Sequence, residues 1–299
     1  MIAGCTVEAL IGKGGMAEVY RAKAVEGPRA GQLVAVKRLL PALARDPAQV
    51  ALFVREGELT RQLRHPAIVS VYETGVAGET PFMVMEYVDG RNLRQILSQC
   101  AARQILLPVD FAAYLAHVVA QALDYAHSAC DAAGRPLGIV HCDVSPSNVF
   151  ISRLGEVKLG DFGVARTSAA GASGGQSAWG KVRYLAPEQI RGEPVTPRTD
   201  LFALGAVLFE LLTNEPAFPG ADVGEVGQKI LGGELRSPAA LRPGMPHALV
   251  ALCLRCMAAL PAERVKSAAE FGREIGALYD AAVGTPLAIA AVVRGLFGA

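Results

Sequence analysis

The chain has 299 residues, of which 52% are hydrophobic and 19% are charged. This length suits one two-lobed fold or two small domains, and the high apolar content excludes intrinsic disorder. Lysine and arginine number 29 and aspartate and glutamate 28, which gives a net charge of +1. A nearly neutral chain has no overall field that attracts nucleic acid or an anionic membrane, so we expect neither as a partner.

The six cysteines are too scattered for a disulfide framework, which indicates a reducing compartment. Cys253 and Cys256 have metal-like spacing, but no second pair completes a zinc site, and we expect a structural role inside an apolar helix. The most apolar runs, 201–209 and 287–293, are far shorter than the ~20 residues that cross a bilayer. The first residues lack the pattern of a signal peptide. We therefore expect a cytoplasmic protein without a membrane span.

Residues 7–88 carry mainly strand patterns. Polar and apolar residues alternate over 18–23, as on a strand with one buried face. Two further runs, 32–38 and 81–88, are apolar and of strand length. These patterns predict a small β-rich lobe in this part of the chain.

One helix interrupts these strands. Asp46 and Pro47 have the residue types of an N-cap and a first helical position, and apolar residues on one face continue the helix to about Leu63. Gly57 lies inside this helix, where it costs about 1 kcal/mol relative to Ala. The sequence therefore predicts a single helix with a weak point at Gly57.

From about Leu93 onward, helix patterns dominate. The segment 110–127 has a broad apolar stripe, and 199–212 is apolar almost all round, which predicts a helix buried at the centre of a lobe. Strand signals in this part are short, at 149–151 and 157–159.

These patterns divide the chain into a small β-rich lobe at 1–86, a larger helical lobe at 87–282 and a short helical tail at 283–299. A hinge is expected near 86–89. The tail has two interpretations, a helix that packs on the large lobe or an exposed segment that docks a partner. The segment 167–180 is rich in Ser, Gly and Ala without periodicity, which predicts a mobile surface loop.

A glycine-rich run, Ile11-Gly12-Lys13-Gly14-Gly15, precedes the first alternating strand. Residues without side chains let backbone N–H groups approach phosphate oxygens closely. A dinucleotide-binding turn would be followed by a helix. A strand pattern follows here, which favours a hairpin that covers a phosphate, although an ordinary glycine-rich hairpin would show the same pattern.

Lys37 ends an apolar strand, and Glu56 lies on the inward face of the predicted helix. A buried lysine is costly unless a carboxylate meets it, so the two residues are candidate partners. Two unrelated surface charges are the alternative interpretation.

The strongest local signal is the run His141-Cys142-Asp143-Val144-Ser145-Pro146-Ser147-Asn148, followed after a short hairpin pattern by Asp161-Phe162-Gly163. Two carboxylates and an amide oxygen at this spacing can supply a proton acceptor and two oxygen ligands for Mg²⁺. Further along the chain come Ala186-Pro187-Glu188, Asp200 and Arg264.

In the order and spacing of these motifs, the chain resembles a bacterial serine/threonine protein kinase of the eukaryotic-like, or Hanks, type from Leu10 to about Tyr279. The resemblance implies an α+β, bilobal protein kinase fold, with a small antiparallel β-rich N-lobe that holds one helix and a larger, mainly helical C-lobe. It also implies an enzyme that transfers the γ-phosphate of ATP to Ser or Thr hydroxyls of protein substrates, with ATP and Mg²⁺ as cofactors.

The resemblance assigns roles to individual residues. Lys37 would hold the α and β phosphates with Glu56 as its partner, and Asp143 would accept the proton of the acceptor hydroxyl. Asn148 and Asp161 would hold Mg²⁺.

The nucleotide-binding residues would be Ile11, Gly12, Gly14 and Ala17 in the lid, Val19, Ala35 and Phe150 around the adenine, the gatekeeper Met85, and the backbones of Glu86 and Val88. The supporting residues would be Glu188 and Arg264 as a buried ion pair, His141 behind Phe162, and His117 and His127 as packing or surface residues.

Cys142 departs from the family pattern. Most members carry Arg there, and that Arg usually receives the phosphate of a phosphorylated activation loop. Without this cation, a loop phosphate loses its charge-assisted partner, unless Arg166 replaces it. We therefore expect activity that does not need loop phosphorylation. The candidate phosphorylation sites are Thr167, Ser168, Ser173 and Ser177.

Ser145 and Lys181 are a second departure. Ser145 takes the place of the catalytic-loop Lys, and Lys181 takes the place of a Thr in the substrate-binding segment before Tyr184. In the family these two positions face each other across the catalytic Asp. We infer that Lys181 brings its ammonium group near Asp143 and the γ-phosphate from the opposite side. The alternative is a weakened or inactive enzyme in which Lys181 is a surface charge.

Two other functions fit the same fold. A pseudokinase would bind nucleotide and act as a scaffold, and a small-molecule kinase would use a different acceptor. The peptide-positioning segment before Ala186-Pro187-Glu188 argues against the second of these. No sensor domain follows the catalytic unit in this sequence, so we expect regulatory input through a partner protein or through a missing segment. A transient kinase dimer is a further candidate partner.

Overall fold

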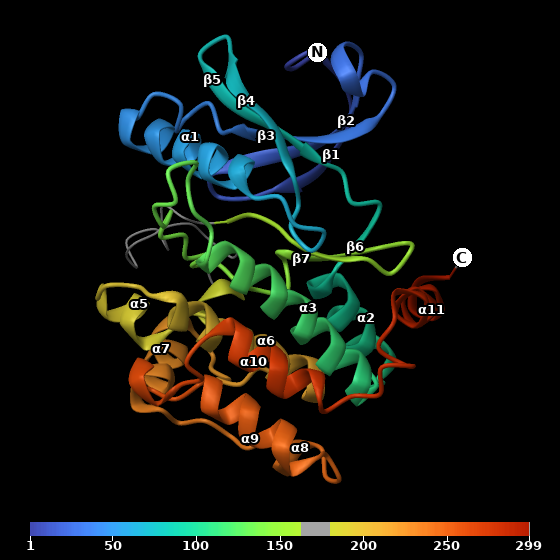
Figure 1. The fold of residues 1–299 in the computed structure, drawn as a ribbon, viewed down its shortest axis with the longest axis vertical. Coiled ribbons are helices and arrows are strands. Elements are labelled where there is room, and N and C mark those ends of the chain that lie inside the picture. Colours follow the sequence, from blue (N-terminus) through green and yellow to red (C-terminus); the bar gives the residue numbers. More distant parts are fainter. Residues whose placement is uncertain (163–179, 299) are drawn as a thin grey trace. The chain divides into compact units, whose positions relative to one another are not determined.

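The computed structural model describes residues 1–162 and 180–298. The chain divides into two compact units, Met1–Val88 and Asp89–Ala299, whose elements are labelled in Figure 1. The first unit is β-rich and the second is mainly helical, which confirms the predicted fold class. The division after Val88 lies within the predicted hinge.

Within residues 1–88, all of which are described, the structure is a five-stranded antiparallel sheet with one α-helix. The strand order is β1-β2-β3-β5-β4. Strands β1 and β4 lack a clear alternating pattern, and the sequence does not predict them. The bounds are β1 Cys5–Lys13, β2 Ala17–Ala24, β3 Leu33–Leu39, α1 Pro47–Gln62, β4 Val71–Ala77 and β5 Thr80–Glu86.

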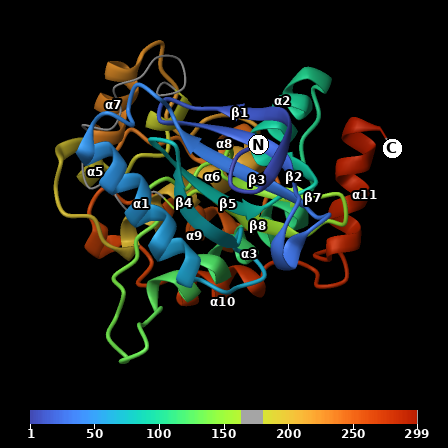
Figure 2. The ribbon, with the colours of Figure 1, turned by 90° about the horizontal axis from the view of Figure 1, so that it is seen from above.

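Helix α1 begins where the sequence predicts. The Asp46 carboxylate accepts a hydrogen bond from the Ala48 backbone N–H at 2.9 Å. Gly57 faces the sheet, and a Cβ atom there would lie 2.6 Å from Thr74 Cγ2 and 3.1 Å from Met83 Cε. The missing side chain therefore lets α1 pack closely on β4 and β5 (Figure 2). Gly57 is a packing requirement rather than a weak point.

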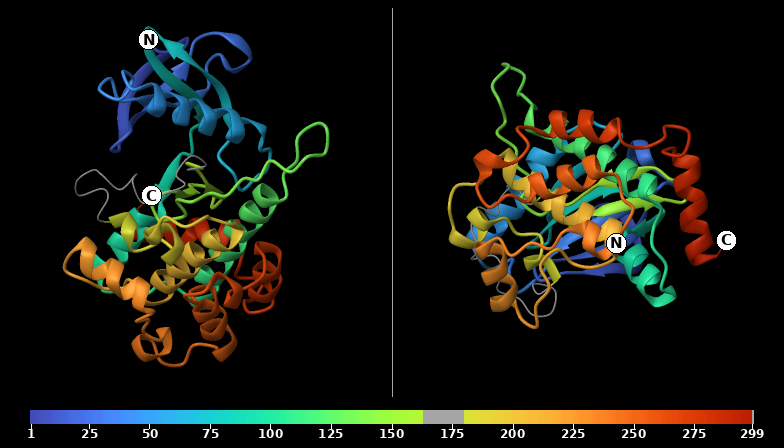
Figure 3. Two further views of the ribbon diagram at one scale, coloured as in Figure 1. Left: turned by 90° about the vertical axis from the view of Figure 1, so that its left-hand side faces the viewer. Right: turned by 90° about the horizontal axis from the view of Figure 1, so that it is seen from below.

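In the described part of the second unit, one small antiparallel sheet, in the order β6-β7-β8, accompanies the helices. Helix α6 lies at the centre, where every residue from Thr199 to Thr213 is buried and α3, α8 and α9 pack around it (Figures 1 and 3). This burial explains why its sequence is apolar almost all round. The bounds are β6 Gly90–Asn92, α2 Leu93–Arg103, α3 Val109–His127, β7 Val149–Ser152, β8 Val157–Leu159, α5 Pro187–Arg191, α6 Pro197–Thr213, α7 Val223–Gly232, α8 Pro238–Leu241, α9 His247–Cys256, α10 Ala268–Gly276 and α11 Pro286–Phe297.

Cys253 and Cys256 lie on the buried face of α9. The Cys253 thiol donates to the Gly205 carbonyl oxygen at 3.5 Å. Gly205 also lets α9 approach α6, because a Cβ atom there would lie 2.7 Å from Cys256 Cβ. Within residues 1–162 and 180–298, no three His, Cys, Asp or Glu side chains gather as a metal site. The two cysteines belong to the packing of α6 against α9, as predicted.

A buried ion pair joins α5 to the segment before α10. Arg264 Nη1 donates to Glu188 Oε1 at 2.7 Å, and Arg264 Nη2 donates to Glu188 Oε2 at 2.8 Å. Burial alone would raise the pKa of Glu188, but the hydrogen bonds from Arg264 and Thr199 outweigh it, so the pKa is lowered. The predicted bracing ion pair is confirmed.

The tail contains helix α11, whose buried side packs against α2 (Figure 1). None of the helices in the described ranges combines the length and the apolar character that a membrane span requires.

Replacement of Gly57 by Ala tests the packing of α1. We expect Gly57→Ala to lower the free energy of unfolding by about 1–3 kcal/mol, the usual cost of overpacking, although Ala is the better helix former by about 1 kcal/mol. Urea unfolding followed by circular dichroism measures the change. Gly295→Ala in α11 is the control, because a Cβ atom at Gly295 meets nothing within 4 Å. Equal effects of the two substitutions would contradict the packing role of Gly57.

Candidate active site

The first unit brings Lys37 and Glu56 into contact. Lys37 lies on β3, in register with Val19 of β2 and Met83 of β5, and Glu56 lies on α1. Lys37 Nζ donates to Glu56 Oε1 at 2.7 Å, and the two side chains are only 11% and 12% exposed. The interpretation of two unrelated surface charges is therefore wrong. Lys37 is a sheltered cation whose carboxylate partner compensates for its burial.

The glycine-rich run forms a β-hairpin. Gly12 pairs with Val19 across β1 and β2, and the Gly14 N–H donates to the Ala17 carbonyl oxygen at 2.9 Å. The chain continues into a strand, which confirms the hairpin prediction. A Cβ atom at Gly12 or Gly14 would meet no atom closer than 3.6 Å, so packing within the unit does not require these glycines, and Ile11 beside them is exposed. Their lack of side chains instead leaves room for an anion to approach the backbone.

The residues expected around an adenine lie on neighbouring strands. Ala35 of β3 pairs with Met85 of β5, and both are buried. The Glu86 N–H donates to the Ser70 carbonyl oxygen at 2.9 Å, so an adenine contact from Glu86 would have to use its carbonyl oxygen. Val88 is the last residue of the first unit.

In the second unit, one buried carboxylate fixes the start of the catalytic loop. Asp200 accepts hydrogen bonds from the backbone N–H groups of His141 and Cys142, both at 2.8 Å, and His127 Nε2 contacts the same carboxylate at 2.8 Å. Cys142 has a left-handed backbone conformation, with φ of 61°. Gln189 Nε2 donates to the Cys142 carbonyl oxygen at 3.0 Å, so both polar groups of this residue's backbone are held.

His141 is neutral and packs on Phe162. Its Nδ1 accepts from the Asp143 N–H at 3.2 Å, so its Nε2 carries the proton and donates to the Gly160 carbonyl oxygen at 3.0 Å. The His141 and Phe162 ring centroids lie 4.5 Å apart. Burial lowers the pKa of His141, against the opposing effect of the Asp200 carboxylate. The prediction that His141 supports Phe162 is confirmed.

Asp143, Asn148 and Lys181 form one cluster. Asn148 Nδ2 donates to the Asp143 carbonyl oxygen at 2.8 Å and to Asp143 Oδ2 at 3.1 Å. Lys181 Nζ donates to the same Oδ2 atom. The buried Ser145 hydroxyl contacts the Ser147 hydroxyl at 3.1 Å. The ammonium group that contacts Asp143 thus comes from residue 181. Residue 145 of the catalytic loop is a serine and supplies no cation.

Asn148 and Asp161 flank the hairpin of β7 and β8. Asn148 directly precedes β7, and Asp161 follows β8 after Gly160, whose N–H donates to the Asn148 carbonyl oxygen at 2.9 Å. Phe150 lies between them on β7. Because Asn148 Nδ2 donates to Asp143, Oδ1 is the side-chain atom of Asn148 that could bind a cation. An amide oxygen and a carboxylate are hard oxygen ligands, so these two residues fit Mg²⁺.

Two polar groupings are absent from the sequence predictions. His127, expected as a packing or surface residue, is a hydrogen-bond partner of Asp200, 73 residues away. Arg94 Nη1 donates to Glu210 Oε1 at 2.8 Å, and the Tyr184 hydroxyl contacts both side chains. Burial raises the pKa of Tyr184 well above its usual value, so its hydroxyl keeps the proton that it donates to Glu210. No local pattern signals these contacts, because each joins distant parts of the chain.

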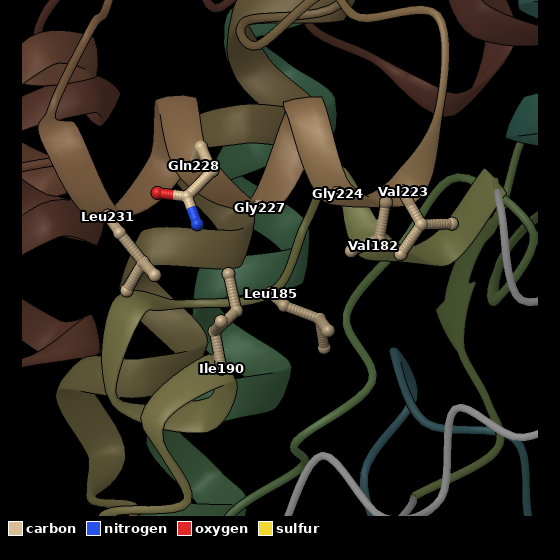
Figure 4. Close-up of a pocket in the computed structure, with 8 residues that line it drawn as sticks. All are labelled: Val182, Leu185, Ile190, Val223, Gly224, Gly227, Gln228 and Leu231. Atoms are coloured by element: carbon tan, nitrogen blue, oxygen red, sulfur yellow. The ribbon is translucent and has the colours of Figure 1, made fainter.

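The second unit also contains an apolar pocket of about 240 Å³. One of its lining residues is Val182, which follows Lys181 in the sequence. Figure 4 shows side chains from the segment before α5, from α5 and from α7 around it. A Cβ atom at Gly227 would meet no atom within 4 Å, so α7 leaves space at this point. The lining residues are Val182, Leu185, Ile190, Val223, Gly224, Gly227, Gln228 and Leu231.

Some residues of the sequence analysis lie outside the described ranges. They include Gly163, the candidate phosphate partner Arg166, and the four candidate phosphorylation sites Thr167, Ser168, Ser173 and Ser177. The predicted surface loop lies outside the described ranges up to residue 179.

Comparisons of the sequence and of the structure with known proteins all find protein kinases. The family model described as "Protein kinase domain" matches residues 5–270. The chain is 39% identical over 298 residues to the probable serine/threonine-protein kinase SCO3848 of Streptomyces coelicolor, and 39% identical over 282 residues to the serine/threonine-protein kinase PknB of Mycobacterium tuberculosis. It is 36% identical over 262 residues to the tyrosine-protein kinase MasK of Myxococcus xanthus.

These alignments cover 97%, 91% and 87% of this chain but only 42%, 42% and 41% of the respective relatives. The chain therefore spans about two fifths of the length of the curated relatives that it matches. Among solved structures, the PknI kinase domain of Mycobacterium tuberculosis is similar with a TM-score of 0.70 and 29% identity. That match covers 93% of this chain and 97% of the PknI chain.

The neutral state of His141 leads to a pH-dependent stability. Its pKa in the folded chain is lowered, so below about pH 6.5 the unfolded chain binds a proton that the folded chain excludes. We expect the free energy of unfolding to fall as pH drops below 6.5, by at most about 1.4 kcal/mol per pH unit from this group. Urea unfolding between pH 5 and pH 8 measures the slope.

His141→Gln should remove this contribution, and His247→Gln, which replaces an exposed histidine, is the control. The other histidines are shared by the variants, so the difference in slope isolates His141. Parallel stability curves for the parent chain and His141→Gln would show that His141 is not held neutral.

Proposed function

This chain belongs to the protein kinase domain family, and on that basis we propose that it transfers the γ-phosphoryl group of ATP to a hydroxyl group of a protein substrate. The observation that carries the proposal is the contact of Lys181 with Asp143 beside Asn148. It gathers a carboxylate, an ammonium group and an amide in one cluster, and phosphoryl transfer depends on such positioned charges.

Both units would contribute residues to nucleotide binding. In the first unit, Lys37, paired with Glu56, would bind the α and β phosphates, and the backbone at Gly12 and Gly14 would cover them. Two observations support this role: the sheltered position of the Lys37 cation, and a glycine hairpin whose glycines are not required by packing. The other nucleotide contacts would come from Ile11, Val19, Ala35, Met85, Glu86, Val88 and Phe150.

Asn148 and Asp161 would hold Mg²⁺ through their side-chain oxygens. When bound, this ion neutralises negative charge on the β and γ phosphates. The chain's own contribution is to fix the two ligands relative to each other, through the β7–β8 hairpin and the hydrogen bond between Gly160 and Asn148.

Asp143 would orient the acceptor hydroxyl and take its proton as the oxygen bonds to the γ-phosphorus and the bond to ADP breaks. The Lys181 ammonium group would stabilise negative charge on the transferring phosphoryl group, in the role usually filled from position 145. Its contact with the Asp143 carboxylate supports this assignment. Lys181 would therefore be a catalytic residue carried by the substrate-binding segment.

The acceptor is proposed to be Ser or Thr. Two of the similar proteins are named serine/threonine-protein kinases and one is named a tyrosine-protein kinase, so phosphoamino-acid analysis of the product is required. The apolar pocket beside Lys181 would receive an apolar side chain of the acceptor protein, next to the residue that is phosphorylated.

Exchange of residues 145 and 181 tests the role of Lys181. We expect Lys181→Thr to lower kcat by about 10²–10³-fold, the usual effect of removing one preorganised donor to the transition state. The double variant Ser145→Lys with Lys181→Thr returns the cation to the catalytic loop and should recover most of the activity. Transfer of labelled phosphate to a generic basic protein measures the rates.

Two controls accompany this experiment. Lys266→Ala removes an exposed lysine of the same unit and should leave kcat unchanged, and Asp161→Ala gives the background rate. An unchanged kcat in Lys181→Thr would reject its catalytic role. A parent chain that binds MgATP in calorimetry but transfers no phosphate would contradict the proposed function and support a pseudokinase.

A separate prediction concerns the pocket beside Lys181. Gly227→Leu adds a side chain toward the open space. We expect it to raise the KM for peptides with an apolar residue beside the acceptor by about tenfold, since one extra or missing methylene in an apolar pocket changes binding by about 10–200-fold. The KM for ATP should not change. Matched peptides with Asp at that position are the control. Equal KM values for the apolar peptides in parent and variant would show that the pocket does not bind the acceptor.

A further inference from the structure

Helix α11 lies beyond the residues that the protein kinase domain model matches, which end at 270. The helix is nevertheless firmly docked, and the Thr285 hydroxyl caps its start by accepting from the Ala288 N–H at 3.2 Å. In Figures 1 and 3 it lies beside α2 at one edge of the second unit. The residues of its buried face are Ile289, Ala290, Val293 and Leu296.

The first turn of α11 rests on the turn between β7 and β8. Gly155 in this turn has φ of 83°, and a Cβ atom there would lie 1.7 Å from the Pro286 carbonyl oxygen and 2.9 Å from the Ala290 nitrogen. Figure 2 shows α11 beside this hairpin. The two backbones therefore touch at a point where only glycine fits.

The last turn of α11 is attached to α2. Gln99 Nε2 donates to the Leu296 carbonyl oxygen at 3.2 Å, and Arg103 Nη1 donates to the Gly295 carbonyl oxygen at 3.1 Å. Both carbonyl groups belong to the C-terminal turn of the helix, whose partial negative charge favours a cation such as Arg103. Helix α11 thus connects the β7–β8 turn with α2.

The β7–β8 hairpin carries the proposed Mg²⁺ ligands at its other end. Asn148 precedes β7 and Asp161 follows β8, whereas Gly155 lies in the turn that joins the two strands. The strands span only Val149–Ser152 and Val157–Leu159, and the three-stranded sheet that they form with β6 is held by the helices that pack on it, α3 against β8 and α2 against β7. Its position therefore depends on what packs against it.

We propose that α11 is a positioning element for the Mg²⁺–nucleotide site. By holding the β7–β8 turn against α2, it sets the positions of Asn148 and Asp161 at the far end of the hairpin. This inference rests on the proposed function, because it assigns these two residues to Mg²⁺. Undocking of α11 weakens Mg²⁺-dependent nucleotide binding and leaves metal-free nucleotide binding unchanged.

Calorimetry with ADP at a series of Mg²⁺ concentrations tests this in the full chain. The variant Ile289→Ala with Val293→Ala removes apolar contacts of the buried face of α11. We expect it to lower Mg²⁺-dependent affinity for ADP by about tenfold or more, as substitution of groups that orient metal ligands usually does. Leu287→Ala on the same helix is the matched control, because Leu287 is 74% exposed.

Gly155→Ala tests the same contact from the hairpin side and should act in the same direction. If the double variant does not fold, Gln99→Ala with Arg103→Ala loosens α11 by removing only its hydrogen bonds to α2. If these variants have a lower melting temperature but an unchanged Mg²⁺ dependence of the affinity for ADP, the inference is overturned. Helix α11 would then contribute only to the stability of the fold. A parent chain without Mg²⁺-dependent ADP binding would contradict the proposed function itself, and the inference with it.

Discussion

The candidate active site depends on one buried carboxylate, that of Asp200. This side chain accepts hydrogen bonds from the backbone N–H groups of His141 and Cys142 and contacts His127, all at 2.8 Å. A carboxylate is costly to bury unless such donors surround it, so Asp200 and the catalytic loop stabilise each other. Because Asp200 lies in the first turn of α6, the helix at the centre of the second unit, the loop that carries Asp143 is attached directly to the core.

The charge beside Asp143 is carried by an element other than the catalytic loop. A lysine has a long flexible stem and acts as a point charge, so its ammonium group can reach one carboxylate from either of two facing segments. Lys181 does so from a segment that is itself anchored, because Tyr184 contacts Glu210 of α6 and Arg94 of α2. The same segment lines the apolar pocket. The cation and the proposed acceptor site therefore share one structural element.

The sequence predicts those features whose cause is local or whose motif is distinctive. Asp46 marks the start of α1 because a cap acts on the residues next to it, and the motif residues indicate the site through their resemblance to a family. Gly57 is misread as a weak point, because helix propensity contains no information about Thr74 across the contact. His127 and Gln189 are missed for the same reason, since their partners lie 73 and 47 residues away. What the sequence leaves out is tertiary contact between distant polar groups.

The backbone of Cys142 is held in place by two other elements of the second unit. A left-handed conformation costs a non-glycine residue on the order of 1–3 kcal/mol, and here the hydrogen bonds with Asp200 and Gln189 offset that cost. Both partners belong to helices of the second unit, α6 and α5. Burial raises the pKa of the Cys142 thiol, so the side chain stays neutral and adds no charge near Asp143. The position of Asp143 therefore follows from the folding of this unit, and the expectation that activity does not require a phosphate on the activation loop stays a prediction.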